Sequence, residues 1–520
     1  MQKLIKKFYN SISNYSDYEQ NIILQAYEFA ENKHKDQKRK TSDEYFSHPL
    51  SVALNLSERS FDYCSVSAAL LHDLPENCKV ELNELENIFG SEISSLVNGV
   101  TKISTVAINN KPLFFSNENF FADRIDNYRK LLLSTAKDIR VIIIKLFDRL
   151  HNIETIHGIE ESKKRFYAIE TIEIYAQIAE RLGFGEIKRK LEDLSFPFAY
   201  PEDFKKFTNL LKSLPDLDES FINEKELEIK KLLKDNGLTN FQIQTRIKHQ
   251  FSIFKKIKET YNFNLNKFFD MYGVRVIVNN IEDCYRVLGL LHTKYHPLVD
   301  RIYDMIAVPK KNGYQSLHTT VRDPSNKIFE IQIRTYEMHQ VAEYGPAAHW
   351  QYKESRNRKE NILSKGQREW LEELSSITKL NSNRDFLEYI KSDLFANKIF
   401  IFTPNGDIFN MPQGSSVIDF AFRIHSNLGE KCFGAKINNK ITELSTTLSN
   451  GDTVEILTSS KAKPNIDWLR FTKTSYAKQK IKRFLRKEDY NRLLNIGKGI
   501  FTDIREQYNL PPILTDKLIN

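Results

Sequence analysis

The alternation of apolar and polar residues predicts a short, half-polar strand in the middle of the chain. Between Ile328 and Thr335, a period of two places Glu330, Gln332 and Arg334 on one face and the two isoleucines between them on the other. A polar strand face is typical either of an amphipathic edge strand that faces water or of a binding site. The alternation alone leaves both interpretations open.

A second strand is predicted upstream, and it is almost entirely apolar. Residues 268–278 hold one carboxylate near their start, Asp270, and one cation, Arg275. A carboxylate at the start of a buried strand is a natural ligand for a hard cation, and Mg²⁺ usually takes one or two carboxylates together with substrate phosphates. Asp270 and Glu330 are therefore candidate Mg²⁺ ligands.

A cationic stretch precedes this apolar strand. Residues 245–256 interleave aromatic residues with five cationic or imidazole side chains, which are Arg246, Lys248, His249, Lys255 and Lys256. Such a composition suits a polyphosphate carried by a stacked base. A solvated helix face is the alternative, because charge runs are more often of that kind.

A phosphate-binding turn is predicted at residues 308–318. Lys310 and Lys311 lie just before an Asn-Gly turn, where cations and backbone N–H groups can meet a phosphate. Tyr314 follows with a flat ring on which a base can stack, and His318 lies four residues later. These neighbours favour the binding-site interpretation of the strand that begins at Ile328.

In their order, these motifs resemble the synthetase domain of the RelA/SpoT family of alarmone enzymes. The resemblance implies transfer of a pyrophosphoryl group from ATP to the 3′-hydroxyl of GDP or GTP, which gives ppGpp or pppGpp. It also implies in-line attack at the β-phosphorus, where positioning and electrostatics supply most of the catalysis.

The resemblance also implies a role for each motif residue. Nucleotide binding would fall to residues that flank the adenine, meet the ATP phosphates, stack on the guanine or support these groups. They are, in that order, Arg246 and Arg275; Lys248, Lys256 and Lys310; Tyr314; and His318 with Gln332. Asp270 would hold Mg²⁺, and Glu330 would share the metal or accept the proton of the attacking hydroxyl.

A different chemistry is predicted for the N-terminal third. Two histidines and two aspartates stand at positions predicted to be helical, namely His48, His72, Asp73 and Asp148. Neutral imidazoles with carboxylates suit Mn²⁺ or a similar cation that activates water for phosphoester hydrolysis. The four residues match the metal ligands of the HD phosphohydrolase superfamily. With Arg39 and Asn152 as nucleotide-binding residues, the region resembles the alarmone hydrolase domain of the RelA/SpoT family.

Two departures from the family pattern bear on activity. Glu76 and Asn77 stand where active hydrolases usually carry Glu-Asp, and an amide has no charge with which to polarise a water or accept its proton. Near the phosphate turn, Arg301 is retained, but Tyr303 replaces the Lys of bifunctional members. The alternatives are an enzyme with both activities, in which Glu76 and Asn77 act in catalysis, and a synthesis-only enzyme with a regulatory HD domain.

The third region predicts a small β-grasp module. A strand-turn-strand pattern begins at Lys398, and a helical segment from Val417 to Leu428 precedes further short strands. The module resembles a TGS domain, which in long members of the family touches the 3′ end of uncharged tRNA on the ribosome, and His425 matches the contacting position. A non-enzymatic regulator that binds tRNA or the ribosome is the alternative from another functional class.

The expected architecture is a multidomain α+β chain with a shortened C-terminal region compared with long family members. A proline-rich stretch, Leu194 to Pro215, separates the first two domains. The expected divisions are an all-α HD-type hydrolase domain with a helical coupling segment (1–195), a mixed α/β nucleotidyltransferase-like synthetase domain (196–355), a helical linker (356–397), the TGS domain (398–460) and a basic helical C-terminal segment (461–520).

Composition is compatible with this plan. The net charge of +8 suits nucleotides or RNA, and the 41% hydrophobic content describes a globular chain. The four cysteines form no CxxC pair, which indicates a reducing cytoplasm and argues against a cysteine zinc site. Apolar runs such as Val141 to Ile144 are far too short to span a bilayer, so no membrane partner is expected.

Overall fold

The computed structural model divides the chain into two compact units. The first comprises residues 1–112 and 126–378, and the second comprises residues 113–125 and 379–520. The structure describes residues 1–35, 37–38, 44–101, 125–158, 160–212, 219–261, 272–310, 313–345, 398–404, 407–488 and 494.

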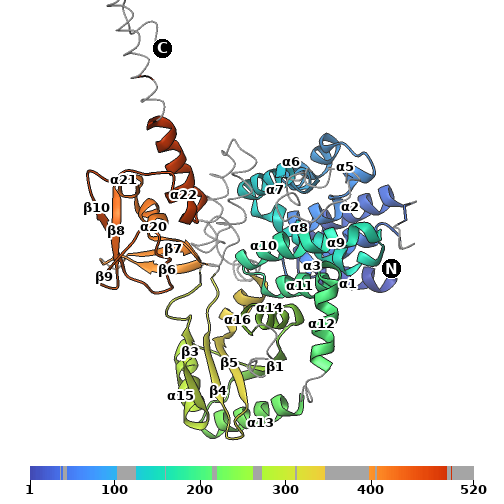
Figure 1. Cartoon of the computed structure of the whole chain (residues 1–520). Helices are drawn as coiled ribbons and strands as arrows, with labels where there is room; N and C mark the ends of the chain where they lie inside the picture. The colour runs from blue at the N-terminus through green and yellow to red at the C-terminus, as the bar shows by residue number, and fades with distance from the viewer. Residues whose placement is uncertain are drawn as a thin grey trace, which may run out of the picture. The chain divides into compact units, whose positions relative to one another are not determined.

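The first unit begins with a bundle of helices (Figure 1). These are α1 (Gln2–Ile12), α2 (Asp17–His34), α3 (Ser47–Ser57), α4 (Tyr63–Leu71), α5 (Leu74–Asn77), α6 (Leu82–Thr101), α7 (Ile125–Lys137), α8 (Ile139–Glu154), α9 (Glu161–Glu170), α10 (Ala176–Arg181), α11 (Gly185–Ala199) and α12 (Pro201–Lys212). A 3-10 turn, Ile156–Gly158, follows α8, and a π turn, Thr171–Tyr175, precedes α10.

Local sequence explains where several of these helices begin. Ser16 and Glu19 form a capping box at the start of α2, because the Ser16 side chain accepts from the Glu19 backbone and the Glu19 carboxylate accepts from the Ser16 backbone. Asp62 and Asp138 are the N-caps of α4 and α8, and each side chain accepts a hydrogen bond from a backbone N–H in the first turn of its helix. The apolar run from Val141 to Ile144 lies in α8, which is buried within the bundle. Among the described residues, no helix is both long and apolar enough to cross a membrane.

A five-stranded mixed sheet forms the second half of this unit. The strands are β1 (Phe241–Ile247), β2 (Tyr272–Val278), β3 (His296–Asp304), β4 (Leu317–Arg322) and β5 (Ile328–Thr335), in the spatial order β1-β2-β5-β4-β3. Only β2 and β5 pair in parallel, and the other neighbours are antiparallel. The accompanying helices are α13 (Glu219–Asp235), α14 (Gln250–Tyr261), α15 (Ile281–Lys294) and α16 (Tyr336–Tyr344).

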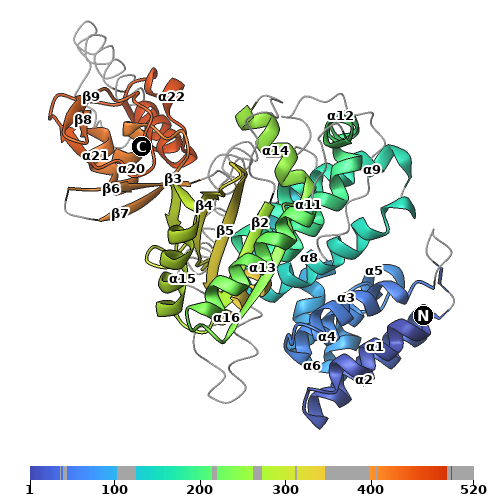
Figure 2. The same cartoon turned by 90° about the horizontal axis from the view of Figure 1, so that it is seen from below.

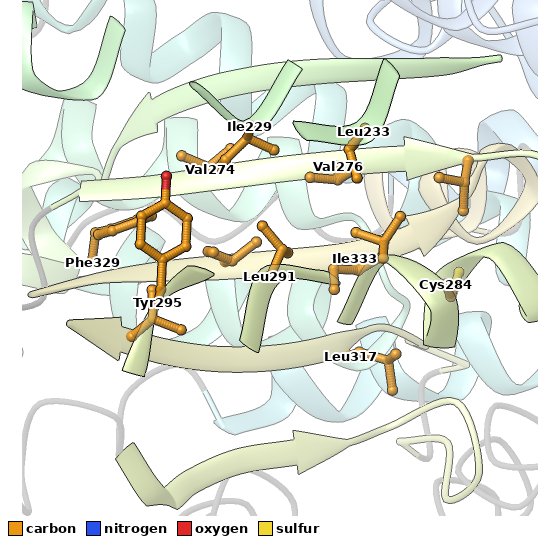
Figure 3. Packing of buried hydrophobic residues seen from close by; sticks show 14 of the residues in the cluster. Ile229, Leu233, Val274, Val276, Cys284, Leu291, Tyr295, Leu317, Phe329 and Ile333 are labelled. Atoms are coloured by element: carbon orange, nitrogen blue, oxygen red, sulfur yellow. The ribbon is translucent and has the colours of Figure 1, made fainter. Parts of the chain in front are cut away.

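One face of the sheet packs against α13 and α15 (Figure 3). Ile229 and Leu233 of α13 lie over Val274 and Val276 of β2 in the same cluster as Ile333 of β5. The period of two then directs the intervening residues to the other face. The predicted alternation of the strand from Ile328 to Thr335 is therefore confirmed, and its polar side lies on a central strand rather than at an edge.

Helix α11 joins the helical bundle to the sheet region. It contacts α8 and α9 of the bundle and α14 and α16 of the sheet region (Figure 2). Asp193 of α11 accepts a hydrogen bond from the backbone N–H of Phe251 at 2.9 Å and so satisfies a free donor at the start of α14. The backbone that follows α16 lies close to the backbone that precedes α11. A Cβ added to Gly345 would lie 2.8 Å from the Leu182 carbonyl oxygen.

The second unit holds two small sheets. Strands β6 (Lys398–Phe402) and β7 (Ile408–Pro412) pair in one, and the other has the order β10-β8-β9 with bounds Val454–Thr458, Cys432–Ile437 and Lys440–Thr442. A parallel bridge between Phe402 and Thr453 links them. The helices are α20 (Val417–Ile424), α21 (Ser426–Glu430) and α22 (Trp468–Phe471), and residues 475–488 are also helical.

The single helix expected from Val417 to Leu428 is wrong in one detail. His425 has extended backbone angles, φ −161° and ψ 140°, and it divides the segment into α20 and α21. Its Nδ1 accepts a hydrogen bond from the Asn427 N–H at 3.2 Å, so the same residue that ends α20 caps α21. Asp419 in α20 accepts from the backbone N–H groups of Lys473 and Thr474 and ties the following chain to the module.

We predict that Gly345→Ala destabilises the first unit, whereas Gly289→Ala does not. Gly345 has φ +58° and meets backbone of the helical bundle, so an alanine there would cost about 1–3 kcal/mol in strain alone. Gly289 lies exposed in α15 with no atom within 4 Å of the added Cβ, and alanine is the better helix former by about 0.5–1 kcal/mol. Thermal unfolding midpoints of the two variants test the contrast, and equal midpoints would contradict it.

Glu192 of α11 makes stability depend on pH. It is buried, and burial raises the pKa of its carboxyl to about 7, although Lys188 and Lys255 oppose the shift and Glu180 and Asp193 add to it. Because the folded-state pKa lies above the unfolded one, protonation of Glu192 favours the folded state. This contribution to stability is complete below about pH 4.5 and is lost as the pH rises through 7.

Glu192→Gln should therefore gain stability relative to the wild type as pH rises, by up to about 3 kcal/mol between pH 5 and 8. Unfolding midpoints of both proteins across this range provide the measurement. A difference between the two proteins that does not change with pH would show that Glu192 is ionised throughout.

Candidate active sites

Three predicted metal ligands come together in the helical bundle. His48 lies in α3, and His72 and Asp73 form the junction between α4 and α5. One ligand atom from each residue lies within 4.8 Å of the others. His48 Nε2 is 3.6 Å from Asp73 Oδ2, and His72 Nε2 is 3.2 Å from Asp73 Oδ1.

The hydrogen bonds of His72 fix which nitrogen faces the cluster. Its Nδ1 lies 2.8 Å from the Ala69 carbonyl oxygen, which can only accept, so Nδ1 carries a proton and Nε2 is the nitrogen turned toward the cluster. Nε2 is buried and makes no hydrogen bond in the described structure, although Asp73 lies beside it. A histidine that donates one N–H to a backbone carbonyl and turns the other nitrogen inward is typical of metal ligands. The residues present therefore fit a divalent cation.

Asp148 of α8 lies at the edge of this cluster. Its Oδ1 is 3.2 Å from His48 Nε2, and its Oδ2 is 2.6 Å from Lys145 Nζ. Burial alone would raise the pKa of the Asp148 carboxyl, but Lys145 and His48 hold it well below its ordinary value. Asn152, a predicted nucleotide-binding residue, donates to Oδ1 at 2.5 Å. The fourth predicted ligand is thus held in its ionised form next to His48.

Glu76 and Asn77 occupy different environments. The Glu76 Oε1 atom is buried without a hydrogen-bond partner, and burial raises the pKa of this carboxyl to about 6, although Lys145 opposes the shift. Asn77 is exposed, and its amide donates to the Tyr45 hydroxyl at 2.8 Å. That hydroxyl in turn donates to Asp73 Oδ2 at 3.0 Å. The Tyr45 hydroxyl thus links the Asn77 amide to Asp73 of the cluster.

Sequence reasoning missed three residues of this site. Lys145 lies three positions before Asp148 on α8, a spacing that brings side chains together on one turn of a helix. Tyr45 precedes α3 and meets Asp73, 28 positions away, so no local signal pointed to it. His151 lies 2.9 Å from His48 through the two Nδ1 atoms. Its place in the run Asp148 to Asn152 was the available signal. Arg39 lies outside the described residues.

The polar face of the sheet carries a hydrogen-bonded series. Glu330 Oε1 lies 3.0 Å from His318 Nδ1, and His318 Nε2 lies 2.8 Å from the Tyr314 hydroxyl. Lys248 Nζ lies 3.3 Å from the other oxygen of Glu330. Burial would raise the pKa of the Glu330 carboxyl, but the hydrogen bond from His318 and the charge of Lys248 lower it far more. Glu330 is therefore a fixed anion at the centre of the sheet.

The predicted phosphate turn brings a cation to the tyrosine of this series. The Lys310 backbone N–H donates to the Tyr314 carbonyl at 3.0 Å, and Gly313 has φ +81° within the turn. This positive φ suits glycine. The Lys310 ammonium lies 5.3 Å from the centre of the Tyr314 ring. Cation and ring thus lie together just before the start of β4.

Arg275 and Gln332 lie beside this series on the same face. They are partners in the β2–β5 register, and Gln332 is also the register partner of His318 in β4. Arg275 Nη1 donates to Gln244 Oε1 at 3.1 Å, and it lies 3.1 Å from Glu343 Oε1 of α16. His318, Glu330, Gln332 and Arg275 therefore form one continuous polar patch.

Other predicted synthetase residues are placed less fully. Lys256 lies in α14 and is partly exposed. Arg246 lies in β1, where only its backbone is described, and Asp270 lies outside the described residues. Tyr303, the residue that departs from the family pattern, is 56% exposed and pairs in register with His318.

Three sequence profiles match the chain. The region found in RelA / SpoT proteins matches residues 245–357, an HD domain matches residues 26–185, and a TGS domain matches residues 399–458. An Aquifex aeolicus protein named guanosine-3′,5′-bis(diphosphate) 3′-pyrophosphohydrolase is 42% identical over 490 residues, which cover 94% of this chain and 68% of that protein. The chain belongs to the RelA/SpoT family.

Two further RelA/SpoT relatives carry different names. A GTP pyrophosphokinase of Myxococcus xanthus is 40% identical and covers 94% of this chain and 64% of its own length. The bifunctional (p)ppGpp synthase/hydrolase SpoT of Escherichia coli is 38% identical, with coverage of 92% and 66%. The chain thus spans about two thirds of the length of these curated relatives.

Membership of the RelA/SpoT family confirms the predicted fold classes. An HD domain, a RelA/SpoT synthetase region and a TGS domain follow one another along the chain in the expected order. The four predicted ligands lie within the HD match, and an HD domain implies dependence on a divalent metal ion. His425 lies within the TGS match and is exposed.

We predict that His72→Ala weakens binding of Mn²⁺ to the HD domain by at least about tenfold, because it removes an inward lone pair from the cluster. The measurement is the rise in unfolding midpoint as Mn²⁺ is added to the metal-free chain. His157→Ala, at an exposed histidine after α8, should retain the wild-type response. An unchanged response in His72→Ala would remove His72 from the metal site.

Proposed function

We propose that this chain both synthesises and hydrolyses (p)ppGpp. The observation that carries the synthetase half is the series Tyr314–His318–Glu330–Lys248, which joins an aromatic ring to a half-buried anion and a cation. The observation that carries the hydrolase half is the convergence of His48, His72 and Asp73. The names of the relatives, which include both activities, support the combination.

In synthesis, the 3′-hydroxyl of GDP or GTP attacks the β-phosphorus of ATP, and the bond from that phosphorus to the oxygen shared with the α-phosphate breaks. AMP leaves with that oxygen, and the hydroxyl proton passes to water. Tyr314 holds the guanine, while Arg246 and Arg275 hold the adenine, so that the reacting atoms approach in line. Lys248, Lys256 and Lys310 offset the charge of the phosphates.

Glu330 is better suited to hold a cation than to accept a proton. His318 and Lys248 stabilise its ionised form, and the lowered pKa makes it a weak base. With Asp270 it would hold Mg²⁺, which when bound would neutralise charge on the transferring phosphates. His318 and Gln332 keep the carboxylate in place.

In hydrolysis, water attacks the phosphorus that joins the pyrophosphate to the 3′-oxygen, and GDP or GTP and pyrophosphate are released. His48, His72, Asp73 and Asp148 would hold Mn²⁺, which when bound would lower the pKa of a water. Glu76, whose pKa is near neutrality, is suited to exchange a proton with that water. Arg39 and Asn152 would bind the nucleotide.

A synthesis-only enzyme is the second candidate. It is favoured by the contact of Asn77 with Tyr45, because an amide at this position cannot accept the proton of a water. We place the protein in the cytoplasm, where its four unpaired cysteines would remain reduced. We further propose that exposed His425 contacts uncharged tRNA or the ribosome.

Two assays on the purified chain test the proposal. One contains ATP, GDP and Mg²⁺, the other contains ppGpp and Mn²⁺, and nucleotides are separated by anion exchange. Products are expected in both assays. Hydrolysis without synthesis would point to Tyr303 as the damaging change, and synthesis without hydrolysis would establish the synthesis-only alternative.

Glu330→Gln should lower synthesis at least about a hundredfold and leave hydrolysis within twofold of the wild type, since the residue acts by its charge at one site. Glu337→Gln, on the first turn of α16 and exposed, is the matched control and should retain both activities. Full synthesis by Glu330→Gln would contradict the assigned role.

A further inference from the structure

Glu343 of α16 binds three arginines from three different elements. Its Oε1 lies 3.1 Å from Arg275 Nη1 of β2 and 2.9 Å from Arg334 Nη2 of β5. Its Oε2 lies 2.6 Å from Arg189 Nη2 of α11. The carboxylate thus joins the polar face of the synthetase sheet to a helix that also packs in the HD bundle.

The cluster holds more positive than negative charge. Burial would raise the pKa of the Glu343 carboxyl, but Arg189, Arg275 and Arg334 lower it to about 2. His339 accepts from Arg334 at 2.6 Å, and burial and the nearby arginines lower its pKa to about 4, so it is neutral. One carboxylate therefore faces three guanidinium groups, and loss of its charge would leave them to repel one another.

Arg275 and Arg189 also line a common cavity. It has a volume of about 630 Å³, within the range of small-molecule sites, and its walls include Asp193 of α11 and His249 at the start of α14. Asp193 binds the α14 backbone, so α11 fixes two parts of this wall, the start of α14 and the arginine cluster.

A guanidinium that stacks on a purine must keep its plane in one orientation. Arginine loses considerable side-chain entropy when it is fixed, and this cost lowers affinity unless the protein has already fixed the group. Gln244 and Glu343 both bind Nη1 of Arg275 in its present orientation. Glu343 is itself fixed by Arg189 and Arg334.

We propose that Glu343 is a positioning residue for ATP, which orients Arg275 toward the purine, and that Arg189 of α11 serves the same pocket through it. This inference rests on the proposed function, in which Arg275 contacts the adenine. It makes a helix packed in the HD bundle part of the wall of the synthetase nucleotide site.

Binding measurements on the full chain test the proposal. The variants are Glu343→Gln and Arg189→Met, and the control is Lys33→Met, which removes a cation of α2 that pairs with Glu84 at 3.1 Å and does not line this cavity. Titration calorimetry gives the affinity for a non-hydrolysable ATP analogue with Mg²⁺ and, separately, for GDP.

Both variants should bind the ATP analogue about tenfold more weakly, which corresponds to about 1.4 kcal/mol. Their affinity for GDP should stay within twofold, and Lys33→Met should match the wild type for both ligands. A purely structural role would lower the unfolding midpoint without this selective loss. If Glu343→Gln does not fold, Arg189→Met decides, because it leaves Glu343 with two arginines.

Arg275→Met separates failure of the inference from failure of the proposed function. If it loses ATP affinity while Arg189→Met and Glu343→Gln do not, the positioning role is overturned. If Arg275→Met binds the ATP analogue as the wild type does, the assignment of Arg275 to the adenine fails, and the inference fails with it.

Discussion

Charges on the buried face of the central sheet must be paired, and much of the first unit is arranged around that constraint. Arg275, Glu330 and Arg334 alternate with the apolar residues of β2 and β5, so the packing of α13 and α15 forces them to the opposite side. Removing an ion from water costs several kcal/mol unless a partner compensates. Lys248 and His318 pair with Glu330, and Glu343 pairs with both arginines. The apolar core on one face therefore dictates a polar site on the other.

Buried charges in the HD region are also paired, but a buried nitrogen of the ligand cluster there is left without a hydrogen bond in the described structure. Lys145 and Asp148 are buried on α8 and pair with each other, whereas the inward nitrogen of His72 makes no hydrogen bond in the described structure. A partner compensates a buried charge for its loss of hydration, whereas an inward nitrogen without a hydrogen bond is available to bind a cation. Lys145 thus holds Asp148 next to His48, and the inward nitrogen of His72 is left available to a cation.

The two departures from the family pattern have unlike consequences. Asn77 donates to Tyr45, which donates to Asp73, so the amide takes part in a complete chain of hydrogen bonds next to the ligands. Tyr303 is largely exposed on the outer strand, so tyrosine in place of lysine removes a positive charge and leaves the packing of the core unchanged. The first residue is joined to the ligand cluster by hydrogen bonds, and the second lies in register with His318 on the neighbouring strand.

The sequence by itself determined the local features. The period of two determined which face of β5 is polar, and the spacing of glycine and lysine determined the turn before Tyr314, because both depend on neighbouring residues only. The motif order determined the domain order. It could not show that Glu343 meets Arg189, which lies 154 positions away, or that Tyr45 lies between Asp73 and Asn77. Those contacts arise where helices from distant parts of the chain cross, and no local pattern encodes them. Tertiary packing alone decided which charges are paired and which side chains remain turned toward a ligand.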